Sequence, residues 1–535
     1  MNALVLILIS IVAFSIAYVT YGAWLTKQWG VDDTKATPSH TRPDGVDYVP
    51  ASAPVLLGHH FASIAGAGPI TGPIAAAMFG WVPVLLWIIF GSIFIGGVQD
   101  YSSIFASIRH DGKSIGEVIH VNMGTKGKKL FAIFAWLTLL LVVAAFVNIV
   151  ANTFVAVPAA ASASLMFIVL AIVFGYAVYR KGVSLKIGTI VGVAFLLLAI
   201  VLGNVFPIAL ARNTWIYLML IYIFIASTTP VWILLQPRDY LNSFLLYGML
   251  AGAVLGLLIS RPTIQLTPYA GFMVNGQFLF PILFITIACG AISGFHSLVG
   301  SGTTSKQLDK ESDAKIVGYG GMLIEGVLAT IAIITAAYVA GPRLTELLAA
   351  GGPTNVFSDG IGVFMTSFGI PFEIGKSFVA LAVSAFALTS LDTGTRLGRF
   401  IFQEYFEPED ANAPKPVFTN MYVATGITVV FGGLLAMTSW QQIWPVFGSA
   451  KQLLAALALM AVAVWLKKLG KNNKMFTIPI VFMFAATLSA LVLLARANLA
   501  TGTWILVIFP VILFILAIIL LVQGFGILFK AEAKE

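Results

Sequence analysis

Long apolar runs recur along the whole sequence, and each can cross a lipid bilayer as a helix. Such a helix needs about 20 predominantly apolar residues, because each residue adds only about 1.5 Å to its length. With 59% hydrophobic and 10% charged residues, the chain is unlike soluble domains, of which about a quarter is charged. This composition excludes a cytosolic enzyme, a secreted scaffold and a nucleic-acid binder. The runs predict an all-α polytopic membrane protein with about fifteen spans, at residues 2–27, 52–80, 82–108, 129–156, 160–180, 183–206, 213–234, 240–260, 280–304, 316–340, 373–400, 417–437, 442–466, 475–496 and 500–529.

The positions of Lys and Arg predict how these spans are oriented. Cytoplasmic loops of membrane proteins carry an excess of positive charge. If the spans alternate in direction, most of the 30 Lys and Arg residues fall on one side, which we therefore expect to be cytoplasmic. The N-terminus then lies outside the membrane and the C-terminus lies inside. The opposite side holds Arg212, Arg261, Arg343, Lys376 and Arg496.

Two weak internal repeats indicate a duplicated architecture. FASIAGAG (61–68) resembles FHSLVGSG (295–302), and AFVNIVANT (145–153) resembles AFALTSLDT (385–393), at nearly equal separations. In the predicted topology, the first pair of segments runs in opposite directions through the membrane. Inverted repeats with interrupted helices are typical of one class of secondary transporter, whose substrate site lies near the bilayer midplane.

Glycine and proline residues predict where these helices are interrupted. Gly66, Gly68 and Pro69 fall within one span, and Gly300 and Gly302 fall in the matching span of the second repeat. Glycine costs about 1 kcal/mol and proline about 3 kcal/mol inside a helix, so a continuous helix is disfavoured. Backbone groups freed at such a break bind anions through N–H groups and cations through carbonyl groups. The alternative interpretation is close helix packing through small residues.

Several longer motifs resemble those of one transporter family. They are GHHFASIAGAGPITGP (58–73), DGVDYVP (44–50), VQD (98–100), LQPRDYLN (235–242), FHSLVGSGTTSKQ (295–307) and FALTSLDTGTRLGR (386–399). On these motifs the chain resembles the carbon starvation protein A (CstA) family of membrane transporters. The resemblance implies uptake of peptides or pyruvate by a multi-pass protein of the bacterial cytoplasmic (inner) membrane. One departure is FGSAKQ (447–452), in which Lys451 replaces an amide residue.

The resemblance also implies kinship with LeuT-type transporters, which are built from five-plus-five inverted repeats with discontinuous helices. We accordingly expect an N-terminal helix and cytoplasmic loop, a first repeat that includes an extra hairpin, a second repeat, and peripheral C-terminal helices. These four parts are predicted at residues 1–51, 52–260, 280–466 and 467–535.

Polar residues inside the predicted spans are the candidates for substrate binding and ion coupling, because an intramembrane charge requires a functional or structural reason. We expect Asp392 to form an ion pair with Arg396, four residues along the helix. We expect the histidines near the breaks to relay protons or to bind substrate. The alternatives are that they form a metal site or that their role is purely structural. The predicted substrate-binding residues are His59, His60, Ser63, Gly66, Gly68, His296, Ser297, Gly300 and Gly302. The predicted ion-coupling residues are Asp100, Glu325, Thr389, Ser390, Asp392 and Thr393.

These observations predict a secondary transporter that imports small carboxylate-bearing solutes by alternating access, coupled to H⁺ or Na⁺. No P-loop motif is present, and the longest loops, at 27–51 and 341–372, hold no catalytic domain. We expect no catalytic residues, no bound metal and no cofactor apart from the coupling ion. The expected partners are the solute and membrane lipids, without nucleic acid, and the oligomeric state is left open. A channel and a membrane-embedded metal-dependent enzyme are the alternatives.

Overall fold

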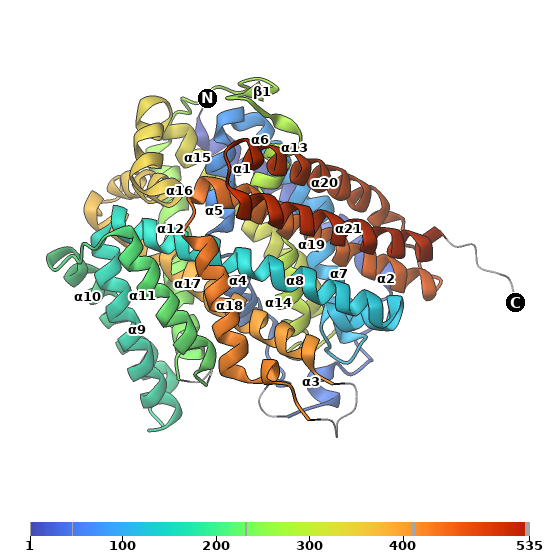
Figure 1. Ribbon diagram of the computed structural model, residues 1–535. Coiled ribbons are helices and arrows are strands. Elements are labelled where there is room, and N and C mark those ends of the chain that lie inside the picture. Colours follow the sequence, from blue (N-terminus) through green and yellow to red (C-terminus); the bar gives the residue numbers. More distant parts are fainter. Residues whose placement is uncertain (1, 45–46, 231–232, 409–413, 530–535) are drawn as a thin grey trace, which may run out of the picture.

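The computed structural model describes residues 2–44, 47–230, 233–408 and 414–529, and it is a bundle of helices (Figure 1). Gly45 and Val46 of the DGVDYVP motif lie outside the described residues. The N-terminal part is one apolar helix that bends at Thr20, followed by a short helix in the next loop. Its elements are α1 (Ala3–Val19), α2 (Tyr21–Trp29) and α3 (Pro38–Thr41).

The first predicted repeat is entirely helical. It contains a broken helix, a helix that is interrupted by a π-helical turn at Ser92–Gly96, and a 42-residue helix that is kinked at Gly124. The helices are α4 (Ala53–Ile64), α5 (Gly68–Ala76), α6 (Trp81–Gly91), α7 (Gly97–Ile108), α8 (Ile115–Ala156), α9 (Pro158–Tyr179), α10 (Leu185–Val205), α11 (Arg212–Thr228) and α12 (Leu235–Ser260).

The second predicted repeat follows a small hairpin, and it too contains a broken helix and a π-helical turn, at Lys315–Gly320. The hairpin strands are β1 (Met273–Val274) and β2 (Gln277–Phe278). The helices that follow are α13 (Leu279–Thr286), α14 (Gly294–Gly302), α15 (Gly321–Val339), α16 (Gly341–Thr366), α17 (Phe372–Phe406), α18 (Met421–Ala436) and α19 (Trp440–Lys468). Two long helices, α20 (Thr477–Ala500) and α21 (Trp504–Phe529), complete the chain.

The number of membrane spans is lower than predicted when helix length is considered. In the described part of the chain, eleven helices are long and apolar enough to cross a membrane, or twelve if the bent pair α4–α5 is one span. Helices α11 and α18 occupy predicted spans but have only 17 and 16 residues. The predicted span 280–304 is divided into the short helices α13 and α14. Apolar runs in the sequence continue across such breaks. Short and broken helices were therefore predicted to be complete spans.

The loop predicted at 341–372 contains a 26-residue helix, α16, which is kinked at Gly352. Gly352 has a φ of 71°, a left-handed conformation that favours glycine, and Pro353 follows it. The two arms of α16 pack against α15 and α17. This helix therefore covers one end of the bundle.

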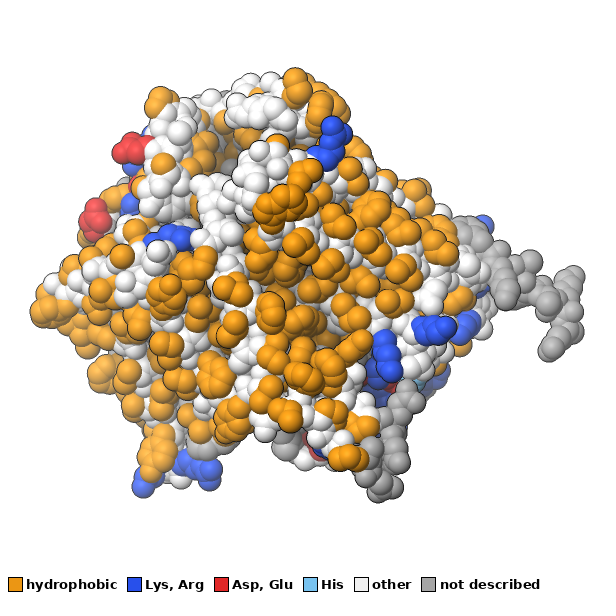
Figure 2. Space-filling model, viewed as in Figure 1, with side chains coloured by type: hydrophobic (Ala, Val, Ile, Leu, Met, Phe, Trp, Pro, Cys, Tyr) orange, Lys and Arg blue, Asp and Glu red, His pale blue; other side chains and the backbone are white. Residues whose placement is uncertain are grey.

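Burial distinguishes the core helices from the peripheral ones. The apolar stretch of α19 is entirely buried, and that of α17 is mostly buried, whereas α10 and α21 leave most of theirs exposed. Apolar side chains cover the middle of the molecule in Figure 2, and the basic side chains visible there lie around its margins, both above and below this region. Such a surface suits contact with lipid. The N-terminus and the β1–β2 hairpin lie at one end of the bundle and α3 at the other (Figure 1), as the predicted topology requires.

Candidate functional site

The first helix break lies where the sequence predicts it. Helix α4 ends at Ile64 and α5 begins at Gly68, with a bend of 50° between them. A Cβ atom on Gly66 would overlap Ser390 of α17, and one on Gly68 would overlap Cys289. Both glycines are therefore required by close approach of neighbouring helices at the break.

The second break does not lie at Gly300–Gly302, so that prediction is wrong. The chain leaves the helix after Thr286 and resumes it at Gly294, while Gly300 and Gly302 belong to α14. Glycine without proline costs a helix only about 1 kcal/mol, and the packing of α14 offsets that cost. A Cβ atom on Gly300 would lie 2.9 Å from Ile104 Cγ1 in α7. Gly300 therefore permits helix packing, as the alternative interpretation stated.

Side chains from other helices bond the carbonyl groups at this second break. Trp444 Nε1 donates to the Thr286 carbonyl at 3.0 Å, and Trp87 Nε1 donates to the Ile287 carbonyl at 3.3 Å. Gln452 of α19 donates to the carbonyl of Phe284. Unsatisfied backbone groups in a membrane interior cost several kcal/mol each, so these bonds make the break tenable.

Gly302 lines a cavity of about 420 Å³ rather than a helix break. The cavity lies between the first part of α8, the end of α14 and the end of α17, and both Lys128 and Glu404 line it. A Cβ atom on Gly302 would meet no other atom within 4 Å. The cavity lies on the side that the topology prediction assigns to the cytoplasm.

Three predicted residues form one buried cluster. His296 of α14 lies between Asp100 of α7 and Glu325 of α15, and all three side chains are completely buried. Its Nδ1 bonds Asp100 Oδ2 at 2.7 Å, and its Nε2 lies 3.3 Å from Glu325 Oε2. Neither Glu325 oxygen has a hydrogen-bond partner among the described residues. We refer to Asp100, His296 and Glu325 as the acid–histidine cluster.

The two acids have similar positions along the backbone. Asp100 lies four residues beyond the end of the π-helical turn Ser92–Gly96, and Glu325 lies five residues beyond the end of Lys315–Gly320. Such π-helical turns occur frequently at functional sites. Gln99, in the orientation that satisfies both of its amide atoms, donates to Asp100 Oδ1 at 2.7 Å. Gln99 was not among the predicted site residues, although it belongs to the VQD motif.

The other predicted substrate-binding residues have separate partners. His60 is buried, and its Nδ1 bonds Thr304 Oγ1 at 2.7 Å, whereas His59 is only partly buried. Ser63 donates to the carbonyl of His59, and Ser297 donates to a carbonyl within α14. The described residues contain no group of three or more His, Cys, Asp or Glu side chains that could hold a metal ion.

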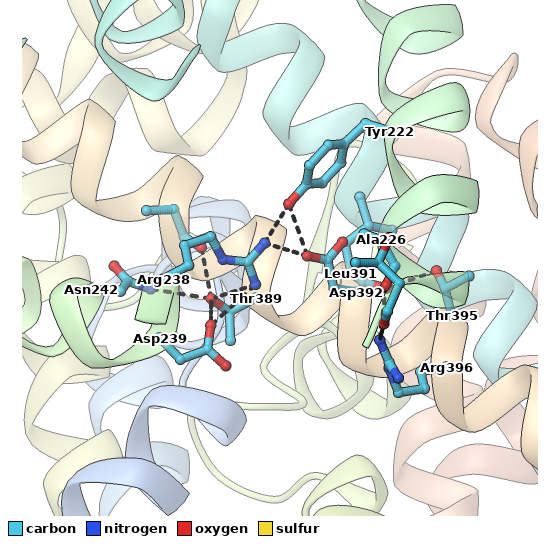
Figure 3. Close-up of polar contacts among 12 residues, drawn as sticks. Tyr222, Ala226, Arg238, Asp239, Asn242, Thr389, Leu391, Asp392, Thr395 and Arg396 are labelled. Carbon is cyan, nitrogen blue, oxygen red and sulfur yellow. Dashed lines mark hydrogen bonds and ion pairs between the residues drawn. The ribbon is translucent and has the colours of Figure 1, made fainter. Parts of the chain in front are cut away.

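A second buried polar network surrounds Arg238 of α12 (Figure 3). The guanidinium bonds the Asp392 carboxylate, and Tyr222 donates to Asp392 Oδ2 at 3.0 Å. The predicted pairing of Asp392 with Arg396 is therefore wrong. Arg396 donates instead to the carbonyl groups of Ala226 at 2.8 Å and Thr229 at 2.9 Å. Spacing along one helix did not reveal Arg238, which comes from another helix.

The Arg238 network also includes Thr389, one of the predicted ion-coupling residues. Thr389 accepts hydrogen bonds from Arg238 at 3.4 Å and from Asn242 at 3.2 Å, and it donates to Asp239 at 3.0 Å. Ser390 is buried, and its hydroxyl group has no partner among the described residues. Thr393 is partly buried. Of the three hydroxyl groups, Ser390 faces the first break.

The Arg238–Asp392 pair should contribute strongly to stability. We expect Arg238→Met to lower the free energy of unfolding by about 3–5 kcal/mol, because Asp392 would remain as a buried, unpaired charge. Adding Asp392→Leu should recover most of that loss. In contrast, Arg42→Met should cost less than about 1 kcal/mol, because Arg42 and Asp111 form an exposed pair at 2.7 Å. Denaturation of the detergent-purified variants measures each effect; equal losses for Arg238→Met and Arg42→Met would contradict this account.

The comparisons with known proteins identify the family. The model of the carbon starvation protein CstA family matches residues 2–348 and 343–490. The chain belongs to this family. The peptide transporter CstA of Bacillus subtilis is 32% identical, covering 100% of this chain and 97% of its own length. The peptide transporter CstA of Escherichia coli is 32% identical over 91% of this chain and 80% of its own length. The pyruvate/proton symporter BtsT of Escherichia coli is 31% identical over 92% of this chain and 81% of its own length.

Membership of the CstA family confirms the resemblance that the motifs predicted. The chain is a multi-pass membrane transporter. Among solved structures, a manganese transporter of Eremococcus coleocola covers 91% of this chain and 99% of its own, with a TM-score of 0.49 and 13% identity. A Na⁺-coupled sialic acid symporter covers 100% of this chain and 99% of its own, with a TM-score of 0.44 and 12% identity. These structural likenesses are too distant to support an argument.

In this CstA-family chain, Lys451 of α19 lies at the second break. Its Nζ donates to Cys289 Sγ at 2.6 Å and lies 4.8 Å from the ring centroid of Phe447. The side chain is 1% exposed. Lys451 stood out in the sequence as a departure within the FGSAKQ motif, but its contact with Cys289 could not be predicted from the sequence.

Proposed function

We propose that this protein imports a small carboxylate-bearing solute, a peptide or pyruvate, together with protons by alternating access. The observation that supports this most strongly is the acid–histidine cluster, buried where α14 leaves the second break. Relatives of the chain are named peptide transporters and a pyruvate/proton symporter. The same observations favour a transporter over an enzyme, and we assign no catalytic residue.

The charge of the acid–histidine cluster makes it suited to carry a proton. Asp100 and Glu325 carry two negative charges when ionised, and His296 between them is neutral or carries one positive charge. An isolated ionised group inside a membrane protein is costly. Among the described cations, Lys451 interacts electrostatically with all three residues. Together with Lys451, one bound proton would neutralise the charges of the two carboxylates. A second proton would compensate for the negative charge of an arriving carboxylate.

The Arg238 network favours protons over sodium as the coupling ion. Sodium requires several free oxygen ligands. The hydroxyl group of Thr389 is already engaged with Arg238, Asn242 and Asp239, and the Asp392 carboxylate is paired with Arg238. A fixed guanidinium in this position supplies the positive charge that a bound sodium ion would otherwise bring.

The two broken helices provide the moving parts of the proposed mechanism. We infer that residues 52–260 and 280–466 form the two inverted repeats of a LeuT-type architecture, with the α9–α10 hairpin as an addition. The matching π-helical turns before Asp100 and Glu325 support this relation. The cavity that Gly302 lines would be part of the route between the breaks and the cytoplasm.

Transport by the purified protein in liposomes tests this proposal. An imposed pH gradient, alkaline inside, should drive saturable accumulation of labelled pyruvate or labelled dialanine. A sodium gradient at equal pH should drive none, and recovered dialanine should be intact. Accumulation that requires a sodium gradient would contradict proton coupling. Hydrolysis of dialanine without accumulation would favour the enzyme alternative.

A further inference from the structure

Lys451 is a buried cation with unused hydrogen-bonding capacity. Its ammonium group has three N–H donors, but among the described residues its hydrogen-bond partner is Cys289 Sγ alone, and it forms no ion pair there. The faces of Phe447 and Phe295 lie 4.8 Å and 5.3 Å away, and such rings stabilise a desolvated cation. These surroundings therefore hold the ammonium group without a carboxylate in direct contact with it.

Other groups at the same break also lack partners. Cys289 lies between α13 and α14 and faces Gly68, the first residue of α5. No side chain caps the N-terminus of α5, where the first N–H groups attract an anion. The buried hydroxyl groups of Thr71 on α5 and of Ser390 opposite Gly66 have no hydrogen-bond partner in the described part of the chain. Lys451 therefore lies, through Cys289, beside the N-terminus of α5, and the two hydroxyl groups without partners belong to α5 itself and to the residue that faces Gly66.

We propose that Lys451 binds the carboxylate of the transported solute, and that Cys289 Sγ holds the ammonium group while the site is empty. This inference rests on the proposed function and identifies the residue that recognises the solute. A carboxylate beside Lys451 would accept the unused N–H donors in charge-assisted hydrogen bonds. A neutral solute of the same shape would leave the buried cation unpaired, so the site discriminates by charge.

The position of Lys451 also connects solute binding to the proton. Lys451 interacts electrostatically with Asp100, His296 and Glu325. A carboxylate bound to Lys451 cancels its positive charge and so favours proton binding at the acid–histidine cluster. Because linkage is reciprocal, protonation of the cluster also favours carboxylate binding. The titratable groups that act on one another here are Lys451, Cys289, Asp100, His296, Glu325, His60 and His59.

Binding of matched solutes to the detergent-purified protein tests this inference. The probes are pyruvate and dialanine, each compared with its neutral amide, and thermal stabilisation measures their affinities. Wild-type protein should bind at least one carboxylate in clear preference to its amide. Lys451→Met should weaken binding of that carboxylate by about 10- to 100-fold, the range expected for loss of a charge-assisted hydrogen bond. It should leave binding of the amide unchanged.

Two further variants complete the test. Lys451→Gln removes the charge but keeps a polar group beside Cys289, and it should lose the same preference. Lys468→Met removes an exposed lysine from the end of the same helix and should behave like the wild type. A folded Lys451→Met or Lys451→Gln protein with the wild-type preference would overturn the role of Lys451 and leave the proposed function standing. A wild-type protein that binds neither carboxylate would overturn the proposed function and this inference with it.

Discussion

Replacing Asp100 by Asn should abolish concentrative uptake while leaving exchange of the solute across the membrane. Asp100 is completely buried and bonds His296 Nδ1 at 2.7 Å, so an amide keeps the shape of the cluster but removes its charge. Without that charge, solute and proton binding are no longer coupled. We expect accumulation driven by a pH gradient to fall by at least about 100-fold, because charge-bearing hydrogen bonds contribute about 1.5–3 kcal/mol and the whole coupling is lost. Counterflow of labelled solute in liposomes measures the exchange that remains.

Glu325→Gln should give the same separation of uptake from exchange, because Glu325 lies at the other side of His296. The matched control is Glu346→Gln, which changes an exposed acid on α16 and should leave both activities unaltered. If Asp100→Asn protein still accumulates solute down a pH gradient as the wild type does, then the acid–histidine cluster does not carry the coupled proton.

Gly68→Val should eliminate solute binding. Even a Cβ atom at this position would overlap both Sγ and Cβ of Cys289, at the point where α5 begins. The larger side chain would fill the space beside the α5 N-terminus and displace Cys289 from Lys451. We expect the affinity for the transported carboxylate to fall below the detectable range in thermal stabilisation assays.

A second-site change distinguishes this steric effect from general damage. Cys289→Gly removes the atoms that Gly68→Ala would meet, so the double variant should bind better than Gly68→Ala alone. Gly526→Val is the matched control, because no atom lies within 4 Å of a Cβ atom at that peripheral position. Unaltered carboxylate affinity in well-folded Gly68→Val protein would show that the first break is not the binding site.

The first break could be predicted from sequence, because Gly66, Gly68 and Pro69 together disfavour a regular helix. The second could not, because its residues, 287–293, contain a single glycine, Gly290, and no proline. Tertiary contacts stabilise the interrupted helix there. Trp444 and Gln452 of α19 donate hydrogen bonds to carbonyl groups at the break. The repeat of FASIAGAG and FHSLVGSG therefore indicated a broken helix but misplaced the break.

The same limit applies to the charged residues. That Asp100, Glu325 and Asp392 need partners followed from their positions within apolar spans. Their actual partners, His296 for the first two and Arg238 for the third, come from other helices. Only the folded arrangement brings these residues together, so spacing along one helix led to the wrong partner, Arg396.

The measurement that tests the central claim most directly is proton movement caused by solute alone. A pH-sensitive dye inside liposomes that contain the protein would report it, with no gradient imposed and no sodium present. We predict that adding pyruvate or dialanine outside acidifies the interior in wild-type liposomes and does not in Asp100→Asn liposomes. Saturable entry of either solute into wild-type liposomes without any acidification would contradict the account.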